Sequence, residues 1–531
     1  MNRGRPRERD AMNAIAGSTL ETLSLRERYR DDYRRRRDPI GEDRLLWRAQ
    51  SLRHLVHLLP GETILELGCG DGLFTRQLFG VSRGENPLTA VSFGSVRERP
   101  EALPKDVEFL PVPSLSGALG GRRFDVVVGM DLLDRADSSK LLGSVYELLK
   151  PGGQMLFYES NPWNVVLKLR RTVGRLLGHE DPRRLLSRPE LFEQIAAIGF
   201  IRVLAVFNDF VYWPLTRSIA WVLRNLSVLL ENMPVVRTLA GSILIQAQKP
   251  PRDVPRPRVS LFEHEALRHS VSVVIPCHNE EMNIGPLVTG LRELFGEYLH
   301  EIIPVDDNST DGTGDVIRRL ASEDPRVKPV IRTAPNGVGR ALADGFGAAT
   351  GEWVLSMDCD FQQLLPEVRD LFDAAAEGVD VVVGSRFSRH SVLLNYPFLK
   401  IVANRGFHLL AQLVLLRRFR DLTNNLKLMR RDVAERLQLT QPGFAVNAET
   451  GLQPLLMGCK IREVPISWIN RAPDMGVSSF HLARVGGGYV QVLLYLGLKK
   501  VLGRGPYRDL DGRGAHRKSW RESEVPPEVR G

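Results

Sequence analysis

At 531 residues the chain is too long for one ordinary hydrophobic core, so two domains of about 200 to 270 residues are expected. Hydrophobic residues make up 43% and charged residues 25%, proportions that exclude a largely disordered chain. The net charge of +9 indicates anionic partners such as membrane headgroups, phosphorylated substrates or nucleic acid, without choosing among them.

The cysteines and the amino terminus point to a cellular compartment. Cys69, Cys277, Cys359 and Cys459 are far apart and match no zinc or disulfide spacing, which favours free thiols in a reducing cytoplasm. The first residues, MNRGRPRERD, lack the apolar stretch of a secretion signal. The sequence also lacks an uncharged apolar run of about 18 residues, so no certain membrane span is expected.

Arginine dominates residues 1–44, where Arg34 to Arg37 are contiguous. A stretch of this kind is most often a solvated or frayed helical arm, and the alternative is contact with anionic lipid or nucleic acid. Only Tyr29 and Tyr33 offer aromatic rings there, so no base-stacking surface is predicted. We therefore expect a solvated basic arm and no nucleic-acid binding.

Two series of short apolar runs alternate with helical segments. Strands are expected first at 64–67, 88–93, 124–130 and 154–160, and again at 272–276, 300–307, 327–332, 352–358 and 380–386. Such alternation predicts α/β domains with parallel sheets, here over 45–248 and 271–482. The Pro/Arg-rich stretch 249–270 between them reads as a linker, and 483–531 as an amphipathic segment with a basic tail.

A glycine-rich motif, Glu66-Leu-Gly-Cys-Gly-Asp-Gly72, follows the first expected strand and begins a helix. Glycines there allow a tight turn and close approach of backbone amides to a ligand. Together with FDVVVGMDLLDR (124–135) and LLKPGGQMLFYES (148–160), the order resembles class I S-adenosylmethionine-dependent methyltransferases over 45–248. The resemblance implies that Glu66, Gly68, Gly70 and Gly72 line the cofactor's methionine and ribose, and that Asp131 borders the substrate.

The second strand departs from that family. An acidic residue usually ends it and binds the ribose hydroxyls, whereas Thr89-Ala-Val-Ser-Phe-Gly94 has no carboxylate. Losing a charge-assisted bond of this kind costs about 1.5–3 kcal/mol, and Ser92 would be a weak substitute. Two interpretations stay open: a working cofactor site, or a methyltransferase-like domain that has lost catalysis and serves as a scaffold.

Three polar motifs follow expected strands of the second domain. They are Pro276-Cys-His-Asn-Glu280, Val305-Asp-Asp-Asn-Ser-Thr-Asp-Gly-Thr313 and Met357-Asp-Cys-Asp-Phe-Gln362. A nucleotide-sugar donor has a diphosphate leaving group, whose charge a carboxylate-held divalent cation can neutralise. Because residues i and i+2 of an extended stretch face the same side, Asp358 and Asp360 can share one ion, with Cys359 turned into the sheet. Asp306 and Asp307 suit binding of the base and ribose.

These motifs resemble family 2 glycosyltransferases of the GT-A fold, and specifically the dolichol-phosphate mannosyltransferase group, over 271–482. The resemblance implies nucleotide contacts by Pro276, His278 and Glu280, and binding of Mg²⁺ or Mn²⁺ by Asp358, Asp360 and Gln362. It also places Arg386, of Val383-Gly-Ser-Arg386, near the phosphates.

Some positions depart from that group. His278 replaces a usual tyrosine, and Asp421-Leu-Thr-Asn-Asn-Leu-Lys427 stands where Asp-x-Thr-Ser-Gly-Phe-Arg is usual. Ser479 occupies the place of a phosphate-binding lysine, and Arg471 or Lys427 is the candidate to compensate for it.

The expected reaction moves a hexose with inversion from a nucleotide-sugar to a polyprenyl (dolichyl-type) phosphate, while Arg386, Arg405 and Arg471 steer the acceptor phosphate. The stretches 391–420 and 486–505 are expected to lie on the membrane as interfacial helices, giving a cytoplasmic protein peripheral to the inner face of the cell membrane. One alternative is a polysaccharide or other soluble hydroxyl acceptor, with Glu449 as the general base. Another makes the amino-terminal half a non-catalytic module that anchors the transferase.

Overall fold

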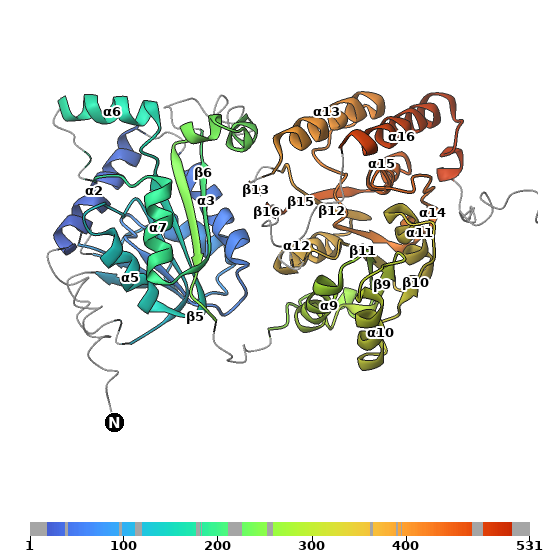
Figure 1. Ribbon diagram of the computed structural model, residues 1–531, viewed down its shortest axis with the longest axis horizontal. Coiled ribbons are helices and arrows are strands. Elements are labelled where there is room, and N and C mark those ends of the chain that lie inside the picture. The colour runs from blue at the N-terminus through green and yellow to red at the C-terminus, as the bar shows by residue number, and fades with distance from the viewer. Residues whose placement is uncertain are drawn as a thin grey trace, which may run out of the picture. The chain divides into compact units, whose positions relative to one another are not determined.

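The computed structural model describes residues 19–37, 41–94, 98–111, 119, 121–176, 181, 183–210, 226–251, 259–361, 365–388, 391–394, 396–469 and 482–511. The chain divides into two compact units (Figure 1). The first consists of Met1–Arg256 with Leu393–Phe398, and the second of Pro257–Val392 with Leu399–Gly531. The break at Arg256 falls inside the Pro/Arg-rich stretch.

The first unit is built on a seven-stranded sheet in the order β3-β2-β1-β4-β5-β7-β6. The strands are β1 (Ile64–Leu67), β2 (Leu88–Ser92), β3 (Glu108–Pro111), β4 (Phe124–Met130), β5 (Leu149–Ser160), β6 (Ile201–Asn208) and β7 (Ser242–Gln248). β1 to β5 pair in parallel, as predicted, and β7 pairs antiparallel with both β5 and β6. The expected α/β fold of this half is therefore confirmed, with an antiparallel edge that the alternation did not predict.

Helices cover both faces of this sheet. Figure 1 shows α3 on one side and α5 and α7 on the other. The helices are α2 (Thr19–Arg37), α3 (Gly41–Val56), α4 (Leu73–Val81), α5 (Ser138–Leu148), α6 (Val165–Leu176) and α7 (Arg188–Ile198). Their apolar stripes close a core that includes Leu141, Leu142 and Val145 of α5 and Leu191 and Ile195 of α7.

Helix α2 corrects the expectation of a solvated arm. Leu23 and Glu27 are fully buried, and Arg26 is 4% exposed. Arg26 donates hydrogen bonds to the Leu132 carbonyl at 2.8 Å and to both carboxylate oxygens of Asp137, at 3.0 and 2.8 Å. Spacing of three, four and seven residues puts Leu23, Arg26, Glu27 and Arg30 on one helical face. The arm prediction is thus wrong for this helix, because its charged side chains find buried partners.

The second unit is also built on a seven-stranded sheet, in the order β10-β9-β8-β11-β14-β12-β15. The strands are β8 (Val271–Cys277), β9 (Leu299–Asp306), β10 (Val330–Ile331), β11 (Trp353–Ser356), β12 (Val381–Ser385), β14 (Lys427–Arg430) and β15 (Ile461–Pro465). β14 lies antiparallel between β11 and β12, and the other pairs are parallel. Each expected strand is present, although the one expected at 327–332 is reduced to two residues. Two further short strands are β13 (Val392–Leu394) and β16 (Ser467–Ile469).

The helices of this unit are α9 (Glu281–Phe295), α10 (Thr313–Glu323), α11 (Val338–Ala348), α12 (Leu365–Ala376), α13 (Phe398–Leu415), α14 (Arg431–Arg436), α15 (Val446–Leu456) and α16 (Leu482–Leu502). The register of the sheet aligns the polar motifs, because Cys277 pairs with Asp306 and Ser356 with Val274. The carboxyl ends of β8, β9 and β11 therefore meet at one edge, where ligands of open α/β sheets bind.

Helices α13 and α16 lie side by side in the second unit (Figure 1), and Lys500 Nζ donates to the Val414 carbonyl at 3.2 Å. Each helix buries one row of side chains: Ile401, His408, Ala411 and Leu415 in α13, and Val492 and Leu496 in α16. By length and composition alone α13 is also long enough to cross a membrane.

Candidate functional sites

The acidic pair of the second unit directly follows β11. Asp358 and Asp360 are half-buried, and Cys359 between them is 2% exposed. The Cys359 thiol points into the protein, with its Sγ 3.9 Å from Cys277 Sγ, so the expected alternation of side chains is present. Burial and the charge of Asp360 raise the pKa of Asp358 to about 7. Two carboxylates that repel each other in this way suit a shared hard cation, so the donor set fits Mg²⁺ or Mn²⁺. Gln362 lies outside the described residues.

Asn425 orients Asp358. Its Nδ2 donates to Asp358 Oδ1 at 2.7 Å, whereas its own Oδ1 is buried and has no hydrogen-bond partner within the described part of the chain. An orphaned acceptor beside two carboxylates is a further oxygen that a cation or a ligand hydroxyl could use. Sequence reasoning missed this residue, although it stands in the Asp421–Lys427 motif.

Arg386 is held by a buried carboxylate. Its Nε and Nη2 donate to the two oxygens of Asp421 at 2.7 and 3.0 Å, and Asp421 is fully buried. Although burial opposes ionisation, Arg386 holds the pKa of Asp421 below its usual value. His408 Nδ1 donates to the Asn404 carbonyl at 2.7 Å while its Nε2 accepts from Leu422 N at 3.2 Å, and burial lowers its pKa to about 4. His408 is therefore neutral, and Asp421 is the counter-charge of Arg386.

Two guanidinium groups lie close to the Phe387 ring. Arg405 lies 5.1 Å and Arg386 6.0 Å from the ring centroid. Arg405 also donates to the Arg420 carbonyl at 2.6 Å, and its burial lowers its pKa. Partly buried cations gathered around one ring create a place for an anion. The expected role of these two arginines toward an acceptor phosphate stays a prediction, and Arg471 and Ser479 lie outside the described residues.

The motif Pro276 to Glu280, which is expected to contact the nucleotide, lies against the end of the neighbouring strand β9. Pro276 is half-buried and His278 exposed, with His278 Nδ1 3.0 Å from the Asp307 carbonyl. Glu280 is held from both sides, because its backbone N donates to Thr313 Oγ1 at 2.8 Å and its carboxylate accepts from Asn283 Nδ2 at 2.5 Å. The motif is therefore preorganised as a loop rather than free to move.

Asp306 and Asp307 are each 5% exposed, and their carboxylates bond protein groups. Asp306 accepts from Ser309 N at 3.0 Å, and Asp307 accepts from Gly337 N at 2.6 Å and pairs with Arg332. Sequence reasoning missed Arg332, whose signal was its position just beyond β10. In this arrangement the two acids shape the loop after β9, and their contact with a base or ribose stays a prediction.

Two residues considered from the sequence prove to be internal. Lys427 is fully buried and donates to the Asn447 carbonyl and to Thr450 Oγ1 at 3.1 and 2.9 Å, while burial lowers its pKa to about 7. It does not reach the surface to replace a phosphate contact. Glu449, the candidate base, is also fully buried and accepts from Thr440, Gln441 and Tyr507. A general base must reach its acceptor hydroxyl, and Glu449 does not.

A three-residue cluster of metal-binding composition occurs elsewhere in the second unit. Ligand atoms of Glu263, His264 and Asp373 lie within 4.8 Å of one another. Glu263 is paired with Arg369, and His264 Nε2 lies 2.8 Å from Asp373 Oδ1. Asp373 is in the last turns of α12, whereas the Asp-x-Asp pair precedes that helix. The three side chains are therefore described as an ion-pair network, and this network is separate from the Asp358–Asp360 pair.

In the first unit, the glycine loop after β1 has the expected conformation but an unexpected neighbour. Gly68, Gly70 and Gly72 have φ angles of 69°, 54° and 75°. Gly70 N donates to Glu27 Oε1 at 2.7 Å and Asp71 N to Asp31 Oδ2 at 3.2 Å, so the loop amides are bonded by α2. At the end of β2, Ser92 Oγ and Phe93 N donate to Glu27 Oε2 at 3.2 and 3.0 Å.

The carboxylate missing from the second strand is thus supplied by α2, and a ligand is not needed to satisfy these donors. Glu66 is 1% exposed and accepts from Thr75 Oγ1 at 2.6 Å, and burial raises its pKa to about 7. With α2 in this position the residues present do not fit S-adenosylmethionine.

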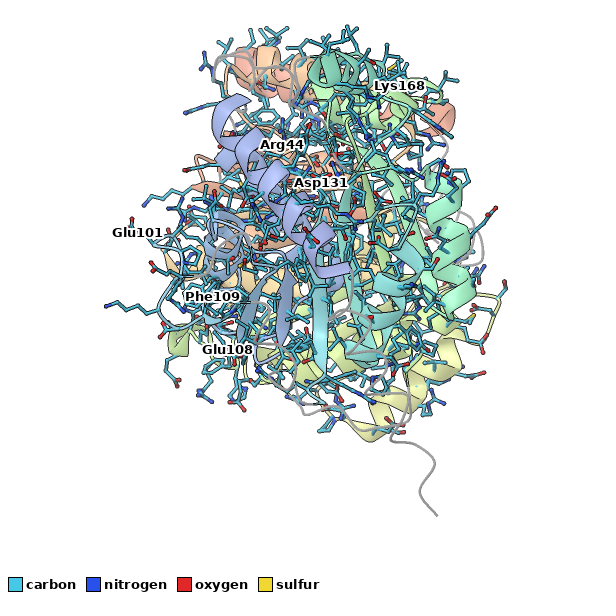
Figure 2. The ribbon with its side chains drawn as sticks, turned by 90° about the vertical axis from the view of Figure 1, so that its left-hand side faces the viewer. Arg44, Glu101, Glu108, Phe109, Asp131 and Lys168 are labelled. Atoms are coloured by element: carbon cyan, nitrogen blue, oxygen red, sulfur yellow. The ribbon has the colours of Figure 1, made fainter. Side chains whose placement is uncertain are left out.

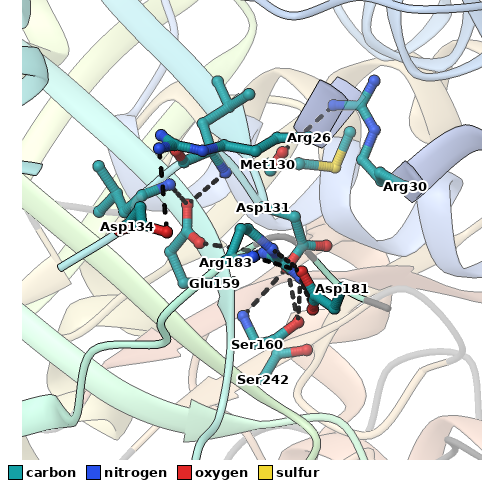
Figure 3. A network of polar contacts seen from close by, with 12 residues as sticks. Arg26, Arg30, Met130, Asp131, Asp134, Glu159, Ser160, Asp181, Arg183 and Ser242 are labelled. Atoms are coloured by element: carbon teal, nitrogen blue, oxygen red, sulfur yellow. Dashed lines mark hydrogen bonds and ion pairs between the residues drawn. The ribbon is translucent and has the colours of Figure 1, made fainter. Parts of the chain in front are cut away.

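Asp131, expected beside the substrate, belongs to an ion-pair network (Figure 3). It accepts from Arg183 Nη1 at 2.6 Å and from Ser160 Oγ at 2.7 Å. Although burial opposes ionisation, Arg183 lowers the pKa of Asp131 to about 2. Burial and Asp131 raise the pKa of Glu159 to about 8, so Glu159 carries a proton at neutral pH. Asp131 therefore holds Arg183 in place.

The strand order with an antiparallel β14, the acidic pair after β11 and the Pro276–Glu280 motif after β8 are those of a GT-A glycosyltransferase fold. The family description "Glycosyl transferase family 2" matches residues 272–438, and "Methyltransferase domain" matches residues 42–225. The chain belongs to glycosyl transferase family 2 through its second unit, fused to a methyltransferase domain.

Similar proteins include a polyprenol monophosphomannose synthase and a dolichol-phosphate mannosyltransferase. The chain is 32% identical over 213 residues to polyprenol monophosphomannose synthase of Mycolicibacterium smegmatis, covering 39% of this chain and 79% of that protein. It is 31% identical over 206 residues to dolichol-phosphate mannosyltransferase of Pyrococcus furiosus, covering 38% of this chain and 57% of the relative. The chain thus spans little more than half the length of the Pyrococcus protein.

Two solved structures are similar to parts of the chain. Glucosyl-3-phosphoglycerate synthase of Mycobacterium tuberculosis, in complex with Mn²⁺ and UDP-glucose, is 22% identical with a TM-score of 0.34, covering 47% of this chain and 86% of that one. A possible histamine N-methyltransferase of Thermotoga maritima is 19% identical with a TM-score of 0.30, covering 43% of this chain and 99% of that one.

Proposed function

We propose that the second unit transfers a hexose from a nucleotide-sugar to a polyprenyl phosphate. The observation that carries this proposal is the close pair of half-buried carboxylates after β11, Asp358 and Asp360, where burial together with the charge of Asp360 raises the pKa of Asp358 to about 7. Asp358, Asp360 and Gln362 would hold Mg²⁺ or Mn²⁺, which when bound stabilises the departing nucleoside diphosphate. The similarity to polyprenol monophosphomannose synthase supports the choice of acceptor.

A phosphate acceptor suits the site better than a hydroxyl. A sugar hydroxyl needs a general base, and Glu449 is enclosed by protein donors. A lipid phosphate is already ionised, so its oxygen can form the new bond to the anomeric carbon while the bond to the diphosphate breaks on the opposite face. Arg386 and Arg405, which both lie near the Phe387 ring, would hold that phosphate.

The acceptor is tested by following radiolabelled hexose from a panel of nucleotide-sugars with the full chain, Mn²⁺ and polyprenyl phosphate. We expect label in the organic phase with one donor, and only when the lipid is present. Because a glycan product stays in water, label in the aqueous polymer without added lipid would favour the polysaccharide alternative instead.

A lipid acceptor requires access to a membrane, and α13 and α16 offer a surface for it. The α13–α16 face exposes Leu399, Val402, Leu409, Leu410, Leu413, Leu494, Val501 and Leu502. Arg417, Arg418, Lys500 and Arg504 are exposed near the carboxyl ends of these helices. Apolar rows flanked by cations are typical of helices that lie in the interface of an anionic bilayer. We infer that this face docks the transferase on the membrane as a peripheral protein.

The first unit has a similar feature, which favours the anchoring module as a second function. In α6, Val165, Leu169, Val173 and Leu176 are 64%, 65%, 45% and 81% exposed. Their spacing of four, four and three residues puts them in one stripe. Lys168 and Arg175, seven residues apart, are exposed along its edge, and Lys168 is marked in Figure 2. We infer that α6 also contacts anionic lipid.

Both surfaces are tested by sedimentation of the full chain with vesicles of phosphatidylcholine alone or with phosphatidylglycerol. We expect Leu409→Asp/Leu413→Asp and Leu169→Asp/Val173→Asp each to weaken binding to anionic vesicles about tenfold, because a charge replaces apolar area at the interface. Phe192→Asp, at a 47%-exposed position of α7, is the matched control and should bind as the wild type does. Equal binding by a double variant and the control would remove that helix from the docking surface.

A further inference from the structure

Helix α2 fills the place where a class I methyltransferase holds its cofactor. We propose that α2 is the resident occupant of this pocket and that the first unit is a folded module that works without S-adenosylmethionine. The inference concerns the first unit alone and stands whether or not the second unit uses a lipid acceptor.

Helix α2 accepts hydrogen bonds from the donors at the edge of the cofactor pocket. The pocket edge offers the amides of Gly70, Asp71 and Phe93 and the hydroxyl of Ser92, and all four donate to α2 at 2.7 to 3.2 Å. One carboxylate, that of Glu27, bridges the loop after β1 and the end of β2. Those two strand ends are where this fold binds the ribose of a dinucleotide or nucleoside. A cofactor would need the donors that Glu27 already uses.

Helix α2 also lies very close to the backbone of the glycine loop. A methyl group built on Gly70 would lie 1.9 Å from Asp31 Oδ2, so α2 approaches the loop backbone more closely than any side chain but glycine allows. Leu23 of the same helix is fully buried in the hydrophobic core of the unit. The helix is therefore seated on the loop without room for a nucleoside between them.

Arg30 of α2 is a buried cation surrounded by carboxylates. Arg30 Nε donates to Asp31 Oδ1 at 3.0 Å and its Nη1 to the Met130 carbonyl at 3.2 Å, as Figure 3 shows for Met130. Glu27, Asp31 and Glu66 surround this guanidinium, and all four side chains are at least nine-tenths buried. S-adenosylmethionine is itself a cation that carries a carboxylate. α2 thus brings both signs of charge on its own side chains, with Arg30 paired to Asp31 within the helix.

Helix α2 would compete with a free cofactor as part of the same chain. A group attached to the same chain competes with free ligand at an effective concentration of about millimolar or higher. Arg26 fastens α2 further through the Leu132 carbonyl and both oxygens of Asp137. A free cofactor would have to break these bonds as well as those of Glu27 and Asp31. We therefore expect α2, rather than free cofactor, to occupy the pocket.

The proposal is tested on the full chain by hydrogen exchange of the peptides that contain Gly70, Asp71 and Phe93, and by calorimetry with S-adenosylmethionine. We expect strong protection and no binding heat at millimolar ligand for the wild type. Glu27→Ala should speed exchange of these amides at least tenfold, and Glu27→Gln, which keeps the shape, should do so less. Glu21→Ala, at an exposed position in the first turn of α2, is the matched control and should leave exchange unchanged.

Unaltered exchange in both Glu27 variants would show that α2 does not cover the loop, and wild-type binding below millimolar would show that the cofactor displaces it; either result overturns the proposal. Binding that appears only after Glu27 is replaced supports it, as does faster exchange without binding. If Glu27→Ala fails to fold, Glu27→Gln and the wild-type titration still give the answer.

Discussion

Replacing Asp360 with Asn is expected to lower hexose transfer by about two to three orders of magnitude while leaving the fold as stable as the wild type or more so. The rate should fall because a cation held by Asp358 and Asp360 to neutralise the leaving diphosphate would lose one of its two carboxylates. Stability should not fall, because burial and the charge of Asp360 together raise the pKa of Asp358 to about 7, and the substitution removes the repulsive part of that shift. The measurements are the initial rate with radiolabelled donor over a Mn²⁺ titration, and the melting temperature of the same samples.

The opposite signs of the two effects separate a functional role from a structural one. Asp315→Asn is the matched control, because this carboxylate is 83% exposed on α10 and pairs only with the exposed Arg318 in the described structure. It should change neither rate nor melting temperature by much. Full activity of Asp360→Asn, or activity of the wild type in excess chelator, would reject the metal role.

The acidic pair could be predicted from the sequence because the direction of its side chains depends only on neighbouring residues in one strand. A strand alternates its side chains, so Asp358 and Asp360 had to face one way and Cys359 the other, and the strand ends of a parallel sheet had to meet. Asn425 could not be predicted in the same way. It reaches Asp358 because β14 inserts antiparallel between β11 and β12, and periodicity does not reveal which strand fills that gap.

Burial of charge was the other property that the sequence concealed. Lys427 and Glu449 occupy motif positions, yet both are fully buried and bonded to protein groups, because a position in a motif does not say which way a side chain points. Helix α2 is the larger case. A count of arginines predicts a solvated surface, whereas Arg26 and Arg30 are buried against Asp137 and Asp31, from another part of the chain and from the next residue. The pairing of Arg26 with Asp137 depends on tertiary structure.

The second large effect is expected at Asp421. Replacing it with Ala should lower the free energy of unfolding of the second unit by about 3–5 kcal/mol, because Arg386, whose side chain is 10% exposed, would be left buried without its counter-charge. Transfer activity should fall too, since Arg386 is then free to leave Phe387. The measurement is urea unfolding of the full chain, analysed as two transitions because the two units can unfold separately.

The matched control removes both charges. In Asp421→Leu/Arg386→Met no buried charge is left unpaired, so most of the lost stability should return, whereas transfer should stay low because the guanidinium is absent. That pattern would assign two roles to one ion pair: Asp421 holds Arg386, and Arg386 meets the acceptor phosphate. If the double variant regained activity together with stability, the pair would be purely structural and the acceptor phosphate would have to be bound by other cations, such as Arg405. If Asp421→Ala unfolded like the wild type, the buried pairing itself would be refuted.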